Sequence, residues 1–134
     1  MAGATVIPES HADILRKKGF AHMATLGPHG EPQSSPVWYE WDGENLLISQ
    51  TTGRQKYKNL QREPRLAVSI TDPDNPYRYL EIRGSVVAID DDPDNALINA
   101  LAKKYIDQDE YPWNQPGDHR VVVRLRPEHT STQG

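Results

Sequence analysis

The sequence predicts one mainly β domain of antiparallel strands, arranged as a barrel with short helices at its ends. Most apolar segments of the 134 residues are short and are joined by turn-forming residues, as in hairpin-connected sheets. Only three segments carry helix signals, so strands and helices do not alternate as a doubly wound parallel sheet requires. The length suits a single domain over 1–134, in which we expect 1–8 and 128–134 to be flexible.

The N-terminal part begins with a predicted helix over 9–18. Ser10 and Asp13 have the spacing of a capping box, and Gly19 follows two lysines as a stop signal. The segment 20–26 mixes polar and apolar side chains and is predicted to be a strand, which the turn formers GPHGEP end.

The segment QSSPVWYEW, residues 33–41, is predicted to be an extended strand. Pro36 has no N–H to donate to a neighbouring strand, so this strand lies at a sheet edge or is bulged there. The dipeptide Asp42-Gly43 then predicts a tight hairpin into a strand over 45–51.

The second half contains two helices and three strands. A short helix within 51–65 ends at Pro64, and strands are predicted over 65–71 and 77–89. A helix over 94–105 follows an acidic stretch, which suits a helix N-terminus. The irregular run QDEYPWNQPGD precedes the last predicted strand, RVVVRLR.

Composition excludes several kinds of site and partner. The chain has no cysteine, which excludes disulfides, thiolate metal sites and cysteine nucleophiles. The formal charge of -4 argues against a nucleic-acid partner, because nucleic-acid-binding domains are usually basic. No apolar run approaches the ~20 residues that cross a bilayer, and the N-terminus lacks signal-peptide features. We therefore expect a cytoplasmic protein without membrane insertion.

One short segment of this acidic chain, TTGRQKYKNLQREPR from Thr51 to Arg65, carries five positive side chains and one acid. Arg54 and Lys56 fall in the first turn of the predicted helix, where they oppose the partial positive charge of the helix N-terminus. Free N–H groups, threonine hydroxyls and these two cations together predict a phosphate site, and Gly53 lets the backbone approach closely. We interpret Arg65 as part of a solvated face.

The same segment, with the strand before it, resembles a known family. Its run R-x-K-x-x-N-L-x-R-x-P-R spans Arg54–Arg65 and is preceded by Gly30, Pro32 and Val37. This pattern is similar to the pyridoxamine 5'-phosphate oxidase-like split β-barrel superfamily, and more narrowly to its F420-dependent (deazaflavin) oxidoreductase branch. The similarity covers about residues 9–127.

The resemblance implies a six-stranded antiparallel split β-barrel that forms a homodimer, with the cofactor site at the interface. It also implies hydride transfer from reduced coenzyme F420 to a small electron-poor acceptor. Arg54 and Lys56 would hold the cofactor phosphate, and Tyr77 and Tyr79 would close the site from the facing surface. The residues that would line the ring and the ribityl chain are Gln33, Ser34, Ser35, Ser49, Gln50 and Thr51.

Lys58 and Arg62 extend the charge of Arg54 along the predicted helix, because residues at i, i+4 and i+8 share one face. The glutamate tail of the implied coenzyme is anionic, which would give this stripe a use. A solvated helix face is the alternative.

Two other functions stay open. One is an FMN-binding flavin reductase-like protein of the same fold, and the other is a non-catalytic carrier of a cofactor, tetrapyrrole or fatty acid. The C-terminal RVVVRLRPEHTSTQG lacks the arginine-rich signature with which pyridoxamine-phosphate oxidases hold their substrate, which argues against vitamin oxidation. Tyr39, Tyr79 and an ordered water are the candidate proton donors.

No metal site is predicted. The histidines lack ligand spacing, and we interpret His22 in its strand as a satisfied core group. The run Asp90–Asp92 lacks the calcium-loop pattern and is assigned to the helix dipole. Among the tryptophans, Trp38 is the one to test for stacking on a cofactor, and 110–118 is a candidate lid or dimer arm.

Overall fold

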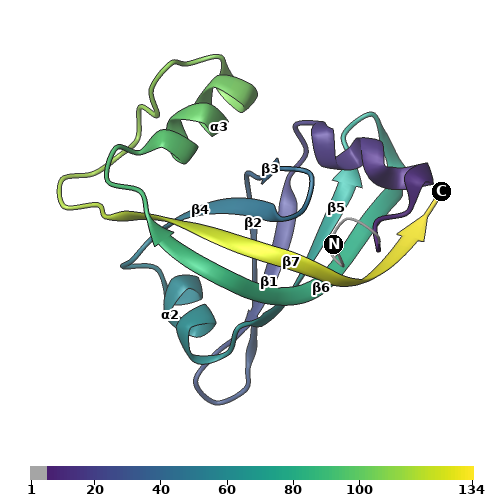
Figure 1. Ribbon diagram of the computed structural model, residues 1–134, viewed down its shortest axis with the longest axis horizontal. Coiled ribbons are helices and arrows are strands. Elements are labelled where there is room, and N and C mark those ends of the chain that lie inside the picture. Colours follow the sequence, from purple (N-terminus) through teal and green to yellow (C-terminus); the bar gives the residue numbers. More distant parts are fainter. Residues whose placement is uncertain (1–5) are drawn as a thin grey trace.

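The computed structural model describes residues 6–134, which form one curved antiparallel sheet with helices around it (Figure 1). In chain order the elements are the 3-10 helix η1 (Glu9–Arg16), β1 (Ala21–Leu26), β2 (Pro32–Val37), β3 (Glu40–Trp41), β4 (Leu46–Thr51), α2 (Gln55–Arg62), β5 (Arg65–Asp72), β6 (Asn75–Asp91), α3 (Ala96–Ile106) and β7 (Arg120–Gln133). Within this described part of the chain, no helix is both long enough and apolar enough to cross a membrane.

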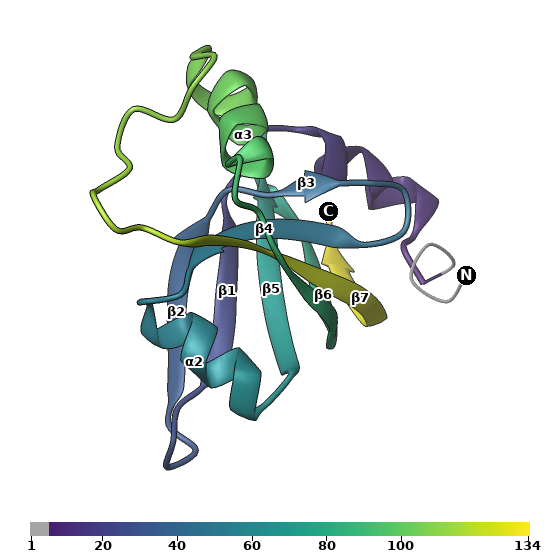
Figure 2. The same ribbon diagram turned by 60° about the vertical axis from the view of Figure 1, so that its left-hand side comes forward.

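The strands pair in the order β2-β1-β5-β6-β7-β4-β3, and every pair is antiparallel. In Figure 2, β1, β2 and β5 run across the direction of β3 and β4, so the sheet curls over on itself. The long strands β6 and β7 connect the two parts. The predicted mainly antiparallel fold is therefore confirmed, although the sheet is not closed, because β2 and β3 remain its edges.

The core lies inside the curl and is built from alternate side chains of the strands. Val121, Val123 and Leu125 of β7 are buried, and so are Leu46 and Ile48 of β4. Successive side chains of a strand point to opposite faces, so one face of each strand supplies the core.

Strand β6 serves both parts of the sheet because its pairing with β7 is interrupted twice. Register shifts occur between Arg83 and Gly84 and again between Val86 and Ala88, and such irregularities bend a strand. A Cβ atom at Gly84 would collide with the carbonyl oxygen of Arg126 in β7, so a glycine permits the close approach of the two backbones.

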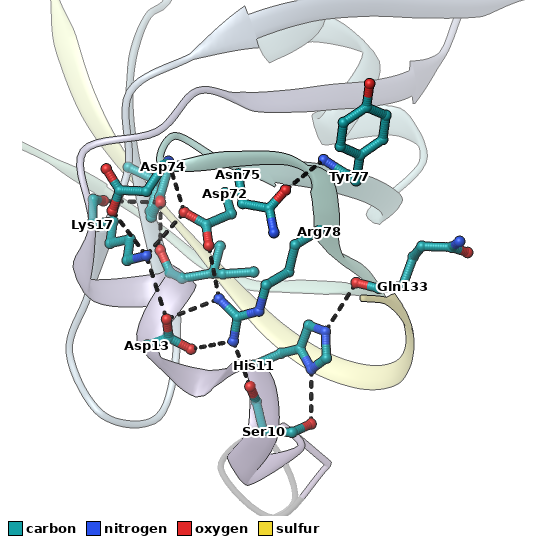
Figure 3. Close-up of polar contacts among 12 residues, drawn as sticks. Ser10, His11, Asp13, Lys17, Asp72, Asp74, Asn75, Tyr77, Arg78 and Gln133 are labelled. Carbon is teal, nitrogen blue, oxygen red and sulfur yellow. Dashed lines mark hydrogen bonds and ion pairs between the residues drawn. The ribbon is translucent and has the colours of Figure 1, made fainter.

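A cluster of ion pairs fixes η1 to the turn between β5 and β6 (Figure 3). Arg78 donates to Asp13 at 2.9 and 2.7 Å and to Asp72 at 2.8 Å. Lys17 pairs with Asp72 at 2.9 Å and with Asp74 at 3.0 Å. Asp72 is only 3% exposed, and two cations compensate its charge.

The chain ends differ from the expectation of flexible termini. Residues 128–133 belong to β7, and Gln133 pairs with Tyr79, in the segment where a flexible C-terminal tail was expected. This extension pairs with the part of β6 that begins at Tyr79, so the backbone groups of both strands are satisfied there. At the N-terminus, 1–5 lie outside the described residues, while the carbonyl oxygen of Val6 accepts a hydrogen bond from Thr130.

Two other segments differ from the predicted elements. The first helix is a 3-10 helix that begins after Pro8, and no side chain within residues 6–134 caps it; Ser10 bonds to His11 instead. The predicted strand 33–41 is divided into β2 and the short β3, which makes seven strands rather than six. Pro36 does lie in an edge strand, and Gly43, with φ of 96°, occupies the predicted hairpin.

Candidate functional site

A cleft of about 350 Å³ lies where the end of β4, the start of α2, the end of β2, α3 and the α3–β7 loop meet. Its lining combines a positively charged polar part with an aromatic part. The lining residues are Phe20, Pro36, Val37, Trp38, Ser49, Gln50, Thr51, Arg54, Lys56, Ile98, Leu101, Tyr111, Trp113, Gln115, Asp118 and Arg120.

The polar part begins at the junction of β4 and α2, as the sequence predicts. Thr51 ends β4, and its carbonyl oxygen accepts a hydrogen bond from the backbone N–H of Arg54, the N-cap residue of α2. Among residues 6–134 no side chain caps this helix, and its first turn contains no acid. The N–H groups of the first turn are therefore available to an anion, and they carry the positive end of the helix dipole.

Lys56 lies in the first turn of α2 and is half-buried. Its ammonium group donates to the hydroxyl of Ser35 in β2 at 3.1 Å. Burial lowers the pKa of Lys56, and the nearby positive charge of Arg54 lowers it further. Two cations that repel each other at a cleft wall are stabilised when an anion lies between them.

Arg120 adds a third cation that the sequence did not reveal. It is the first residue of β7 and pairs with Thr51 in the β4–β7 ladder. Its guanidinium donates to Asn114 at 3.2 Å and to Ser49 at 3.5 Å, and it lies 4.9 Å from the ring centre of Tyr111. Only the pairing of β4 with β7 reveals it, because these strands are far apart in the sequence.

Gln50 provides an unusual acceptor in the same wall. The residue is only 3% exposed, and its Oε1 atom has no hydrogen-bond partner among residues 6–134. A buried carbonyl without a donor is costly, and in native structures it points to local strain, a functional role, or a bound water or ion. A ligand carrying an N–H or O–H group would satisfy it.

The predicted residues of β2 have another placement. Gln33, Ser34 and Ser35 lie beside the cleft and are absent from its lining. Gln33 accepts a hydrogen bond from Asn59 of α2, which is fully buried and also donates to Thr25. Within one chain Gln33 therefore helps to fix α2, and Ser35 acts on the cleft through Lys56.

Two predicted tyrosines lie elsewhere in the chain. Tyr79 pairs with Gln133, at the end of β7 opposite to Arg120, so one chain does not bring it into the cleft. Tyr77 is 83% exposed near the ion-pair cluster of Figure 3. Tyr39 is fully buried, its hydroxyl donates to two backbone carbonyls, and burial raises its pKa to about 12. It is therefore a structural residue rather than a proton donor.

The predicted stripe of Lys58 and Arg62 does not line the cleft. Lys58 is exposed on α2. Arg62 donates to the carbonyl oxygen of Leu26 at 2.6 Å and so connects α2 to β1.

The aromatic part of the lining is a connected set of rings. Trp38 is stacked on Tyr105, with ring centres 5.0 Å apart and planes at 6°. Tyr111 meets Trp38 edge-on at 5.9 Å, and Trp113 meets Tyr111 edge-on at 5.5 Å. Trp38 thus packs within the protein, while Trp113 remains 56% exposed at the far end of the set.

Metal ligation has no support in residues 6–134, where no group of three or more His, Asp or Glu side chains could hold an ion. Asp92 accepts hydrogen bonds from the backbone N–H groups of Ala96 and Leu97 at the start of α3. His22 is exposed in β1, so its interpretation as a core group is wrong; the buried histidine is His11, which contacts Gln133. A single alternating strand does not reveal which of its faces is buried.

Solved structures define the class of this fold. An F420 reductase is similar over 93% of this chain and 98% of its own, with 42% sequence identity and a TM-score of 0.84. A conserved hypothetical protein of Mycobacterium tuberculosis is 25% identical over 96% of this chain and 85% of its own, with a TM-score of 0.75. A heme storage protein of Vibrio cholerae shares the fold alone, at 13% identity, 93% coverage of each chain and a TM-score of 0.67.

A curated relative from Streptomyces rimosus is similar in sequence. This 5a,11a-dehydrotetracycline/5a,11a-dehydrooxytetracycline reductase is 37% identical over 78 residues, which are 54% of this chain and 53% of that protein. The match therefore spans about half of the relative's length.

Residues 7–134 match the pyridoxamine 5'-phosphate oxidase family, and the chain belongs to it. The family resemblance predicted from the arginine- and lysine-containing run is thereby confirmed.

Proposed function

We propose that this protein is an F420-dependent oxidoreductase, in which the polar part of the cleft holds the coenzyme. The proposal rests mainly on one observation. Arg54, Lys56 and the uncapped start of α2 lie in the same cleft as Gln50, whose Oε1 atom is unpartnered among residues 6–134. The cations and N–H groups suit a phosphate, and Gln50 suits an N–H donor of a flat polar ring. The names of the F420 reductase and the tetracycline reductase support the same class of reaction.

When bound, reduced F420 supplies a hydride, which carries two electrons and one hydrogen nucleus, to an electron-poor carbon of the acceptor. A proton from solvent would complete the reduced acceptor. The protein's part is to bind and orient the two molecules and to exclude water. No nucleophilic side chain is needed, which agrees with a chain that lacks cysteine.

We further propose a homodimer in which Tyr77 and Tyr79 of one copy approach the cleft of the other. The exposure of Tyr77, a large ring at the surface, supports this placement. If the proposal is correct, Tyr77→Ser weakens coenzyme binding although the residue lies outside the cleft of its own chain. Unchanged affinity in that variant would remove these tyrosines from the site.

Equilibrium binding to F420 and to FMN tests the proposed function. We expect the protein to bind F420 more tightly than FMN, and Lys56→Ala to weaken F420 binding by roughly tenfold or more, because hydrogen bonds to charged groups contribute about 1.5–3 kcal/mol. Arg65→Ala is the matched control, since Arg65 is exposed and paired with Glu63 outside the cleft. Tighter binding of FMN would favour the flavin reductase-like alternative.

A turnover assay separates an enzyme from a carrier. We expect repeated oxidation of reduced F420 when an electron-poor acceptor is present. Binding without turnover, over a broad set of acceptors, would favour a carrier of the kind represented by the heme storage relative.

Lys58 remains a candidate contact for the anionic tail of the coenzyme, because it is exposed on the helix that begins at the cleft. Lys58→Ala should then weaken binding of F420 and leave binding of its tail-less core unchanged. Equal affinities of the variant and the parent protein for F420 would assign Lys58 to a solvated face.

A further inference from the structure

We propose that the ion-pair cluster of Figure 3 and the end of β7 form a clamp, which positions Tyr77 and Tyr79 for the cleft of a second copy of the chain. Arg78 is then a positioning residue for coenzyme binding, although it does not line the cleft. This inference rests on the proposed function and its homodimer, and it gives the cluster a role in that same site.

The first residues of β6 alternate between the two faces of the sheet. Leu80 and Ile82 are fully buried in the core, and Arg78 lies two residues before Leu80, so it belongs to the inner face. Tyr77 and Tyr79 therefore belong to the outer face. Figure 3 shows the Tyr77 ring pointing away from the cluster, while Arg78 extends into it. The contacts that fix Arg78 thus also fix the direction of the rings on either side of it.

Three groups hold the guanidinium of Arg78. It donates to the carboxylates of Asp13 and Asp72 and to the backbone carbonyl of Ser10. The Arg78 side chain is only 18% exposed. Hydrogen bonds to carboxylates are strong, and two of them that join one guanidinium set its plane as well as its position. Because Ser10 and Asp13 belong to η1, this helix is one side of the clamp.

The end of β7 forms the other side. Tyr79 pairs with Gln133, whose carbonyl oxygen accepts a hydrogen bond from Nε2 of His11 in η1 at 3.0 Å. His11 is 5% exposed, so this contact is shielded from water. A Cβ atom at Gly134 would lie 3.0 Å from the carbonyl oxygen of Tyr77, which shows how closely the chain end packs on the same segment. The end of β7 therefore connects η1 to the tyrosines.

The outer face offers a second copy a surface to pack against. Arg83, further along the face of Tyr79, lines a groove of about 520 Å³. Leu26 and Ala67 supply apolar surface to this groove, and Glu128 adds the opposite charge. A two-fold contact joins the same surface of two copies, and a face with apolar groups and both signs of charge can match itself. Among residues 6–134 the tyrosines are absent from the lining of their own cleft, so a second copy has to bring them there.

Arg78→Met tests the clamp, because it removes the guanidinium and keeps much of the side-chain volume. We expect this variant to bind F420 about threefold to tenfold more weakly than the parent protein, as the displacement of an aromatic contact predicts. In a chain that carries both Tyr77→Ser and Tyr79→Ser, the same change should have no further effect, because residues that act through one contact are not additive. Arg124→Met is the control, since Arg124 pairs with Asp90 outside the cluster and the cleft. Unchanged affinity, or an equal loss with and without the two rings, would overturn the clamp.

A second measurement needs no coenzyme. The chain has no cysteine, so a cross-link between introduced cysteines is specific. One copy carries Tyr77→Cys and the other carries Gln115→Cys in the cleft lining. We expect a bis-maleimide reagent to join the mixed copies, and to do so more slowly when the first copy also carries Arg78→Met or, if that variant does not fold, Asp13→Asn.

Absence of this cross-link, or an equal rate with the cluster disrupted, would overturn the clamp. Failure of F420 and FMN binding, by contrast, would overturn the proposed function, and the cross-linking rate distinguishes the two.

Discussion

Lys56 shows how one side chain can link the cleft to pH. Its pKa is lowered by burial and by Arg54, so the free protein loses this charge at a lower pH than an exposed lysine does. A bound phosphate favours the charged ammonium group and raises its pKa. The affinity for a phosphate ligand is therefore complete below the lowered pKa and decreases as the pH rises through it.

We expect F420 binding to weaken on the alkaline side, and Lys56→Arg to keep its affinity there, because a guanidinium stays charged. Arg54→Gln should move the weakening to higher pH, since removal of the neighbouring cation raises the pKa of Lys56. Titration by coenzyme fluorescence between about pH 7 and about pH 10 measures both effects. Identical alkaline profiles for the parent and Lys56→Arg would contradict this account.

Gln50 and Asn59 are buried amides whose replacement should have opposite effects on stability. Gln50 Oε1 is without a partner among residues 6–134, so Gln50→Leu should raise the free energy of unfolding by about 1 kcal/mol and weaken coenzyme binding. Asn59 is hydrogen-bonded to Thr25, Gln33 and Gln55, so Asn59→Leu should lower the free energy of unfolding by about 1–3 kcal/mol. Urea unfolding measures both, and destabilisation by Gln50→Leu would mean that Oε1 is satisfied in the free protein.

Among the elements, α3 depends on a single carboxylate. Asp92 accepts hydrogen bonds from Ala96 and Leu97 at 3.0 and 2.9 Å, and α3 in turn supplies Ile98 and Leu101 to the cleft. Removing such a contact at a helix start typically costs about 1 kcal/mol.

We therefore expect Asp92→Ala to lower the free energy of unfolding by about 1 kcal/mol, and Asp92→Asn to lower it by less, because the amide oxygen still accepts. Urea unfolding with both variants measures the difference. Asp94→Ala is the control, since Asp94 is exposed at the same turn. Equal effects of Asp92→Ala and Asp94→Ala would point to general charge near the helix rather than to these two bonds.

Most elements could be predicted because their signals are local. Turn formers at Asp42-Gly43, the stop at Pro64 and the alternation in β6 each act within a few residues. The extension of β7 to Gln133 and the division of β2 from β3 could not be predicted from the sequence, because they depend on which strand lies alongside. The signal for the start of α2, which has no acid in its first turn, is also local, whereas Arg120 and the ring set around Tyr111 reach the cleft through tertiary contacts.

For the whole molecule, the ion-pair cluster of η1 and the β5–β6 turn should set the sensitivity to acid. The hydrogen bond from Lys17 is the largest cause that lowers the pKa of Asp72, from 3.8 to about 2, and the hydrogen bond from Arg78 also lowers the pKa of Asp13. A lowered carboxyl pKa stabilises the fold above the unfolded value, and this contribution is lost as the pH falls toward the folded value.

We expect the stability of the parent protein to decrease between about pH 4 and about pH 2, and Asp72→Asn to show a weaker dependence in that range because it has no proton to gain. The variant should be less stable near neutral pH. Thermal unfolding over this pH range measures both curves, and Asp109→Asn, at an exposed position outside the cluster, is the control. Parallel curves for the parent and Asp72→Asn would show that the ion-pair cluster does not cause the loss of stability in acid.

The loop 107–119 has a consequence for how this protein could diversify. It takes no part in strand pairing, and Gln108, Tyr111 and Asn114 are the loop residues that bond to Ala102, Asn99 and Arg120. The other residues of the loop can therefore vary while the register of the sheet and the arrangement of β4 and α2 persist. Exchanging this stretch as a cassette between related chains should transfer a preference for one molecule over another and leave the redox partner common to all of them.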